Sequence, residues 1–331
     1  MKKRLYVDFH VLQTVPPSCI NRDDTGSPKT AIYGGVTRAR VSSQAWKHAM
    51  RQAFVEESLL DEEDVGKRTK KVTELVEKEI AALAPDMDAA KLAKEVVKNT
   101  GLKVNEKKDE KKLKTLIFLS KAQVSALAEL GIEGCTEAQK YKDALGAAPS
   151  VDMVLFGRMV AEAASLNYDA AAQVAHSIST HAVQNEYDYF TAVDDCPDSD
   201  NAGASHLDTK EYNSATLYRY ATVNVMELER HLGAKKAAEV VRSFGEAFIR
   251  SMPTGSQNTF ANRTLPDAVY VTIREDQPVN LCGAFERAVR KSAEGYAEPS
   301  KSALQAYAQQ LYQSFAEAPA KSFTVGTGLE A

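Results

Sequence analysis

Residues 217–225 read LYRYATVNV. Leucine, alanine and valine take one face of this stretch, while two tyrosines and a threonine take the other, which is the two-residue period of a β-strand. Residues 234–251 follow with apolar side chains at helical spacing, and the proline and glycine of MPTGSQNT end that pattern. Residues 268–274 alternate again. This part of the chain is therefore predicted to run strand, helix, strand.

The beginning of the chain is also predicted to run from a strand to a helix. Residues 5–11 alternate as a strand with one buried face, and the loop PPSCINRDDTGSPK at 16–29 leads towards a helix at 40–51. A further amphipathic helix is predicted at 281–291, and a block rich in alanine, lysine and glutamate at about 55–172 has helical spacing. The order predicts an α+β fold of the ferredoxin-like kind with a large helical insertion after its first helix.

The predicted helix at 40–51, RVSSQAWKHAMR, has the features of a phosphate-binding helix. A serine can cap its start, and one polar, mostly cationic stripe lies opposite an apolar stripe. Free backbone amides and the helix dipole favour an anion at this end. The side chains assigned to it are Arg38, Arg40, Ser42, Ser43, Gln44, Lys47 and Arg51. The alternative is a solvated amphipathic helix with an ordinary cap, preceded by a glycine pair at 34–35 that permits a tight turn or a close approach to a ligand.

Charge is distributed unevenly along the chain. The whole sequence has 41 basic and 45 acidic residues, a net charge of −4, which argues against indiscriminate binding of nucleic acid. Residues 1–51 nevertheless hold nine basic and three acidic residues, a net of +6, whereas residues 185–211 hold one and eight, a net of −7. A basic region and an acidic region on one molecule could support head-to-tail association of copies, although a charge run is more often only a solvated surface.

Length and composition limit the remaining classes. A chain of 331 residues with 44% hydrophobic content can form one large domain with insertions or two domains. Four cysteines, at 19, 135, 196 and 282, have no metal-ligand spacing and predict free thiols in the cytoplasm. The sequence predicts no membrane span, because no stretch is long and apolar enough. It has neither the P-loop pattern nor a GxGxxG motif of a nucleotide-binding enzyme, and it predicts no metal and no cofactor.

Several motifs together resemble the CasC family, the RNA-binding backbone subunit of the type I-E CRISPR Cascade complex within the RAMP superfamily. They are SCINRDD at 18–24, GGVTRARVSSQAWKHAMR at 34–51, LFGRM at 155–159, AHSISTHAV at 175–183, DYFTAVDD at 188–195 and YRYATVNV at 218–225. The resemblance runs from about residue 5 to at least residue 289. It is weaker in the helical insertion.

The resemblance implies a hand-shaped, non-enzymatic subunit. An RRM-like palm would comprise residues 1–54 and 221–323, helical fingers residues 55–184, and an extended thumb, a β-hairpin or loop, residues 185–220. Copies would stack head to tail along the guide crRNA beside other Cascade subunits. Target DNA would then reach the complex by pairing with the guide.

Family roles are carried over residue by residue. The positions that match those gripping the RNA backbone are Arg22, Ser42, Ser43, Gln44, Lys47 and Arg51. Tyr189, Phe190 and Val193 match thumb residues that wedge between bases and displace one, with Met159 beside them, although the family pattern usually has tryptophan at 189. Further RNA contacts, chosen from basic positions and a glycine-containing turn, are Arg219, Gly255, Gln257, Arg290 and Lys291.

The competing class is a metal-dependent RAMP-type ribonuclease. Asp23 with Asp24, or Asp194 with Asp195, would hold a divalent ion near a bound phosphate. Consecutive residues of a strand face opposite ways, and such pairs in loops usually form turns, so adjacency alone is weak support for catalysis.

Overall fold

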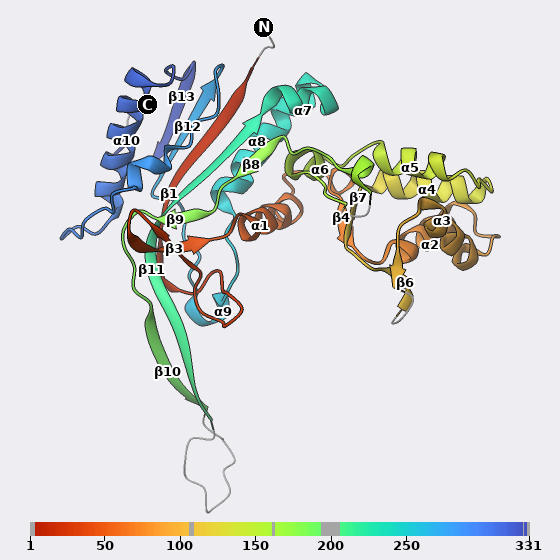
Figure 1. Cartoon of the computed structure of the whole chain (residues 1–331), viewed down its shortest axis with the longest axis horizontal. Coiled ribbons are helices and arrows are strands. Elements are labelled where there is room, and N and C mark those ends of the chain that lie inside the picture. The colour runs from red at the N-terminus through yellow and green to blue at the C-terminus, as the bar shows by residue number, and fades with distance from the viewer. Residues whose placement is uncertain (1–3, 106–108, 161–162, 193–205, 327, 330–331) are drawn as a thin grey trace, which may run out of the picture. The chain divides into compact units, whose positions relative to one another are not determined.

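The computed structural model describes residues 4–105, 109–160, 163–192, 206–326 and 328–329. The chain divides into two compact units (Figure 1). The sheet unit comprises Met1–Gln52, Gln173–Met226 and Phe244–Ala331, and the helical unit comprises Ala53–Ala172 and Glu227–Ser243. The result is a mixed α+β protein.

The sheet unit is built on one antiparallel sheet. Its strands follow the order β13-β12-β1-β11-β9-β3-β2, and β8 and β10 also pair with β11. The strands are β1 (Tyr6–Ser18), β2 (Thr30–Tyr33), β3 (Val36–Val41), β8 (Ala172–Val174), β9 (Ser177–Ser179), β10 (Glu186–Ala192), β11 (His206–Asn224), β12 (Ala268–Arg274) and β13 (Lys321–Gly326). All three predicted strands are confirmed, and β12 has the predicted bounds.

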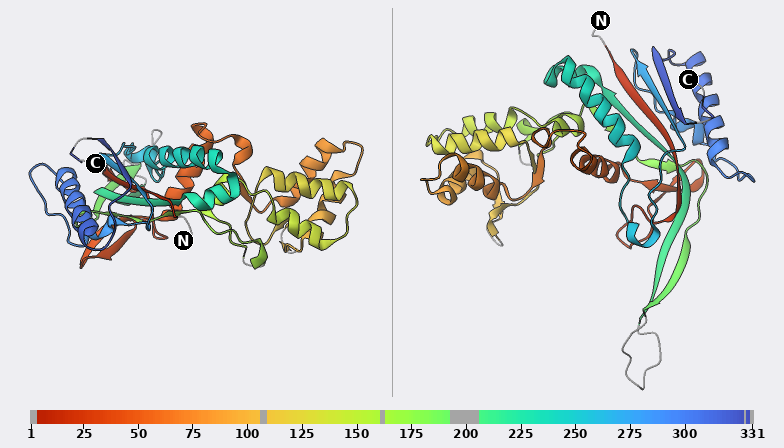
Figure 2. Two further views of the ribbon diagram at one scale, coloured as in Figure 1. Left: turned by 90° about the horizontal axis from the view of Figure 1, so that it is seen from above. Right: turned by 180° about the vertical axis from the view of Figure 1, so that it is seen from behind.

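Both faces of the sheet are covered. On one face, Phe9 of β1 packs against Phe244 and Phe248 of α8 (Ala234–Arg250), with ring centroids 5.6 and 6.3 Å apart. On the other, Leu12 of β1 and Tyr218 and Tyr220 of β11 pack with the 3-10 helix η3 (Leu281–Phe285) and with α10 (Ala297–Ser314). Figure 2 shows α10 lying along the β12–β13 side of the sheet. The core therefore has an apolar layer on each side of β1 and β11.

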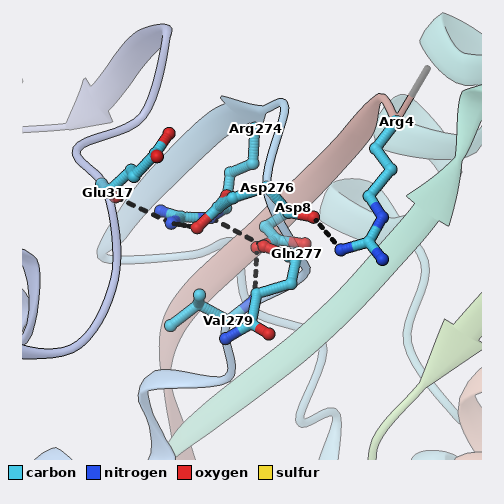
Figure 3. A network of polar contacts seen from close by, with 7 residues as sticks. All are labelled: Arg4, Asp8, Arg274, Asp276, Gln277, Val279 and Glu317. Atoms are coloured by element: carbon cyan, nitrogen blue, oxygen red, sulfur yellow. Dashed lines mark hydrogen bonds and ion pairs between the residues drawn. The ribbon is translucent and has the colours of Figure 1, made fainter. Parts of the chain in front are cut away.

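A buried polar network ties β12 to the chain around it (Figure 3). Arg274 pairs with the Asp276 carboxylate at 2.7 Å and donates to the Glu317 carbonyl at 2.8 Å. Asp8 accepts a hydrogen bond from the backbone N–H of Val279 at 2.8 Å, although burial raises the pKa of its carboxyl group. A buried charge needs such partners to offset lost hydration. The network belongs to the fold.

The helix predicted at 281–291 is wrong. Only η3 is helical there, and the chain continues irregularly until α10 begins at Ala297. The Asn280 side chain caps η3 by accepting from Cys282 N–H at 2.9 Å, and the Val289 N–H donates to the carbonyl of Thr180 at 2.9 Å. A long-range bond therefore draws this segment alongside the end of β9 and away from helical geometry.

The glycine pair serves the fold. Gly34 and Gly35 have φ of +59° and +77° and form the turn between β2 and β3. A Cβ atom on Gly34 would lie 1.6 Å from the carbonyl oxygen of Glu286. Of the two readings left open by the sequence, the tight turn is the one the structure supports.

The helical unit has its own apolar core. Val76 and Ile80 of α2 pack with Val96 of α3 and Leu127 of α4, all fully or almost fully buried. Its elements are η1 (Glu62–Asp64), β4 (Lys67–Thr69), α2 (Val72–Leu83), α3 (Ala89–Thr100), β5 (Val104–Asn105), β6 (Asp109–Leu113), β7 (Ile117–Leu119), α4 (Lys121–Ile132), α5 (Ala138–Gly146), α6 (Val151–Phe156) and η2 (Ala164–Leu166), with α7 (Val225–Leu232) and α8 continuing into it. The small strand pairs β4–β7 and β5–β6 were not predicted.

Candidate nucleic-acid interface

The helix predicted at 40–51 is α1 (Ser43–Glu56). Ser42 caps it, because its Oγ accepts a hydrogen bond from the Ala45 N–H at 3.2 Å. The Ser42 N–H donates to Oδ1 of Asn21 at 2.8 Å, which ties the helix start to the preceding loop. Trp46 is fully buried and donates to Oγ of Ser177 at 2.9 Å. The apolar stripe seats the helix as predicted.

Cations gather around the start of α1. Arg40 donates to the Thr30 carbonyl at 3.1 Å, and its Nη1 lies 3.3 Å from Nδ1 of His176. Partial burial lowers the pKa of His176, and the positive charges of Arg40, Lys29 and Lys47 lower it further. Three cations therefore act on one imidazole beside a helix N-terminus, which is a suitable environment for a phosphate. Lys29, the last residue of the loop at 16–29, was not among the predicted interface residues.

The polar stripe of α1 lies where it was predicted. Gln44 is exposed, and Lys47 and Arg51 are half-buried on the same helix. Ser42 and Ser43 are largely buried, and both the hydroxyl and the N–H of Ser42 are engaged within the fold, by Ala45 and Asn21. These residues offer a polar surface next to the cations of the helix start.

The burial of Arg38 corrects its assignment to the predicted interface. Its side chain is fully buried, and it donates to the carbonyls of Tyr33, Ser179 and Phe285 at 3.1, 2.9 and 2.8 Å. Burial also lowers the pKa of its guanidinium group. In this structure Arg38 joins β3 to β9 and η3, and it is unavailable to RNA.

The burial of Arg219 likewise corrects its assignment as an RNA contact. Its guanidinium carbon lies 3.8 Å from the ring centroid of Trp46 and 4.6 Å from that of Phe248. Its Nη1 donates to Gln13 Oε1 at 2.6 Å, and its Nη2 donates to the Phe248 carbonyl. Burial lowers the pKa of Arg219 to about 9. This arginine lies beneath α1 and supports the helix from inside.

The loop before β2 carries Arg22, which is exposed. Next to it, the Asp23 carboxylate accepts from the Thr25 N–H and hydroxyl at 2.9 and 2.7 Å and from the Ser27 N–H at 3.0 Å. The Thr25 hydrogen bond is the main reason why the pKa of Asp23 is lowered. One carboxylate of the ribonuclease hypothesis is therefore engaged in a turn.

Among the residues that the structure describes, no metal site supports the ribonuclease hypothesis. There, no three or more histidine, cysteine, aspartate or glutamate side chains gather as a metal site. Asp194 and Asp195 lie outside the described residues.

The loop of Gly255 lies against the Arg22 loop. A Cβ on Gly255 would come within 2.3 Å of the Ile20 carbonyl oxygen, and an open depression is lined by residues 20–26 together with Gly255. Gln257 begins the short helix α9 (Gln257–Phe260) and is half-buried. The structure thus brings Gly255 against the Arg22 loop, with Gln257 two residues further along the chain.

Arg290 and Lys291 are exposed on the irregular segment after η3. Arg287, also exposed, precedes them. Their predicted helical setting is wrong, but their charges remain on the surface of the sheet unit.

Strands β10 and β11 extend as a two-stranded ribbon (Figure 1). Tyr189 is 70% exposed and Phe190 is 43% exposed. Because they are consecutive on a strand, they face opposite ways, so the single wedge that was predicted is divided between two faces. Tyr187, 57% exposed, shares a face with Tyr189 and was missed. Val193 lies outside the described residues, and Met159, in the helical unit, is exposed.

Comparisons with known proteins cover nearly the whole chain. A family model described as CT1975-like protein matches residues 7–331. A solved chain of a "CRISPR RNA-guided surveillance complex, pre-nicking" has 33% identity and a TM-score of 0.84, covering 98% of this chain and 94% of that one. A chain of another "CRISPR RNA-guided surveillance complex" has 31% identity and a TM-score of 0.62, covering 96% and 87%.

No curated protein matches the chain. Within the described residues, none of the helices combines the length and the hydropathy that crossing a bilayer requires. By its match to the family model over residues 7–331, this chain belongs to the CT1975-like protein family.

Proposed function

We propose that this chain is the RNA-binding backbone subunit of a CRISPR RNA-guided surveillance complex. The observation that carries the proposal is the similarity, in both sequence and structure, to chains of two such complexes over at least 96% of this chain. The gathering of Arg40, Lys29 and Lys47 at the start of α1 supports it independently, because clustered cations beside a helix N-terminus suit a phosphate backbone.

We further propose the type I-E Cascade and the CasC role within it, on the strength of the motifs in the sequence. The sheet unit would be the palm, the helical unit the fingers, and the β10–β11 ribbon the thumb. The strand order β12-β1-β11-β9, with antiparallel neighbours throughout, supports a ferredoxin-like palm.

The proposed mode of binding is independent of sequence. Arg22, Arg40, Lys47 and Arg51 would hold phosphates, while the thumb would displace bases at intervals and leave the others free to pair with target DNA. A subunit that must accept any guide gains from contacting the backbone, which all guides share. Copies would follow one another head to tail along the crRNA, in contact with other Cascade subunits.

The experiment mixes the purified chain with single-stranded RNAs of increasing length in magnesium buffer. Particle mass, from light scattering on a sizing column, should rise in steps with RNA length while the RNA stays intact. Shortened RNA would instead favour the ribonuclease, and RNA of constant length with no rise in mass would contradict assembly along the guide.

A double charge reversal, Lys47→Glu with Arg51→Glu, tests the backbone grip. It should weaken binding of unrelated RNA sequences equally and flatten the plot of log affinity against log salt by roughly 0.7 per lost phosphate contact on a single strand. Loss of binding for one sequence alone would contradict the proposal.

A further inference from the structure

His176 lies between β8 and β9, in the sheet unit, and its side chain is exposed. The N–H of Ala175 donates to a backbone carbonyl of β11 at 2.9 Å. On the other side, Ser177 pairs with Val41 of β3, and its hydroxyl accepts from the Trp46 ring of α1 at 2.9 Å. Both neighbours of His176 are thus fixed, which holds its imidazole next to the start of α1.

One hydrogen bond defines the protonation state of this imidazole. Nη1 of Arg40 lies 3.3 Å from Nδ1 of His176. A guanidinium group can only donate, so Nδ1 accepts, and the single ring proton of the neutral imidazole is on Nε2. Nε of Arg40 donates to the Thr30 carbonyl at 3.1 Å, which keeps the guanidinium group in place. The structure therefore holds a neutral histidine whose Nδ1 faces a cation.

The charges that act on this ring come from three elements. Partial burial is the largest cause of the lowered pKa of His176, and positive charges on Arg40 of β3, Lys29 of the loop before β2 and Lys47 of α1 lower it further. A fourth positive charge, on the imidazole itself, is disfavoured while these cations surround it. An anion among them would reverse that preference.

His181 shows how a histidine of the fold differs. It is buried, its Nδ1 lies 2.9 Å from the Ala182 carbonyl oxygen, and its Nε2 accepts from the Thr216 N–H at 3.1 Å. Both of its ring nitrogens are therefore used by the backbone around it. His176 instead is exposed and accepts from an arginine, an arrangement that adds a titratable group to a cationic surface.

A phosphate can use both side chains at once. If Nδ1 of His176 were protonated, its N–H would oppose the N–H of Arg40, but a phosphate oxygen can accept from both donors. The negative charge of the phosphate also favours the imidazolium form. Building on the proposed function, we infer that His176 binds an RNA phosphate together with Arg40 and takes up a proton as it does so. RNA binding by this chain is therefore coupled to pH.

The sign of the coupling follows from the proton uptake. Affinity rises as the pH falls below the pKa of His176 in the RNA complex, and it levels off below the pKa in the free chain. One proton can change the affinity by at most about tenfold per pH unit. Between about pH 7.5 and pH 5.5 we expect the affinity to rise by about 3- to 30-fold at constant ionic strength.

The test uses the full chain and a single-stranded oligouridylate of about eight nucleotides, within the site size of single-strand binders. The RNA has no terminal phosphate, so neither its bases nor its backbone titrates in this pH range. Dissociation constants are measured across the range, and calorimetry in two buffers of different ionisation enthalpy counts the protons taken up. The unaltered chain should take up protons on binding, to a limit of one per site.

Three variants separate His176 from the other histidines. His176→Gln should abolish the proton uptake and flatten the pH dependence. His176→Lys, which stays charged, should bind at the higher pH as tightly as the unaltered chain binds at the lower pH. His231→Gln is the matched control, because His231 lies on α7 in the helical unit and pairs with Glu227 at 3.2 Å, and it should change neither measurement.

Three outcomes would overturn the inference. They are RNA binding by the unaltered chain that does not vary with pH, proton uptake that persists in His176→Gln, and loss of the uptake in His48→Gln, since His48 is exposed on α1. Should a variant fail to fold, an NMR titration of His176 in the unaltered chain replaces it, and an equal pKa with and without RNA would be equally decisive. Failure of the proposed function would look different, because the chain would then bind no RNA at any pH.

Discussion

Replacement of Arg38 by methionine should destabilise the sheet unit without acting on RNA directly. Methionine keeps much of the apolar stem but removes the donors to the carbonyls of Tyr33, Ser179 and Phe285. Each buried carbonyl left without a donor costs about 1–3 kcal/mol, while removal of a buried charge offsets part of the loss. The expected decrease in the free energy of unfolding is about 3–5 kcal/mol.

The chain contains a built-in reporter for this measurement. Trp46 is the only tryptophan, and it is fully buried in the sheet unit. Its fluorescence during urea unfolding therefore follows that unit even if the helical unit unfolds separately. Arg38→Met should shift the midpoint strongly to lower urea, and Arg38→Lys should recover little, because an ammonium group cannot reproduce the fork of donors.

Arg40→Met is the matched control. It changes the same residue type two positions along the same strand, where the side chain is only half-buried. We expect a small change in stability, below about 1 kcal/mol, with a reduced salt slope for RNA binding. The reasoning would be refuted if Arg38→Met kept the original midpoint and lowered the salt slope instead, since Arg38 would then reach RNA.

Three further predictions test the described contacts. Gly34→Ala should lower the free energy of unfolding by about 2–4 kcal/mol because its Cβ meets a carbonyl oxygen. Gly35→Ala has no atom near its Cβ and should cost only the left-handed strain of about 1 kcal/mol. Equal urea midpoints of Trp46 fluorescence in the two variants would contradict this. Burial lowers the pKa of His10 to about 3, so the free energy of unfolding should fall by up to about 1.4 kcal/mol per pH unit from pH 6.5 down to 3. His10→Gln should reduce that dependence, as measured by urea titrations at each pH. Lys29→Gln should raise the pKa of His176 in an NMR titration, and an unchanged value would remove Lys29 from the cation cluster.

Local patterns predicted the strands and α1 well because both depend on neighbours along the chain. Alternation placed β12 exactly, and the apolar stripe of α1 needs only the buried Trp46 and its helical neighbours. The segment at 281–291 has equally good helical spacing, yet the hydrogen bond from Val289 to Thr180 holds it in another conformation. A partner more than a hundred residues away is not visible in a local pattern.

The β10–β11 ribbon shows a second limit of prediction from the sequence. The sequence left the thumb as a hairpin or a loop, and only the pairing of β10 with β11 assigns residues to faces. Once the strand is known, the separation of Tyr189 from Phe190 follows from the two-residue period, and Tyr187 joins Tyr189. Tyr187 could have been found from the alternation of YDYF alone, had that stretch been treated as a strand.

Arg38 and Arg219, two of the buried arginines, explain why charge counting overestimates the interface. Arg38 and Arg40 share a face of β3, yet Arg38 meets carbonyls from β9 and η3, which cover its position, while Arg40 lies beyond that cover next to His176. Arg219 is enclosed by Trp46 and Phe248 in the same way. A guanidinium group has five donors and keeps its charge when buried, so the fold can use it as a multiple cross-link. The net charge of +6 at residues 1–51 therefore includes Arg38, which acts within the fold. Under the proposed function, RNA binding by the sheet unit would depend on the more exposed cations at Arg22, Lys29, Arg40, Lys47 and Arg51.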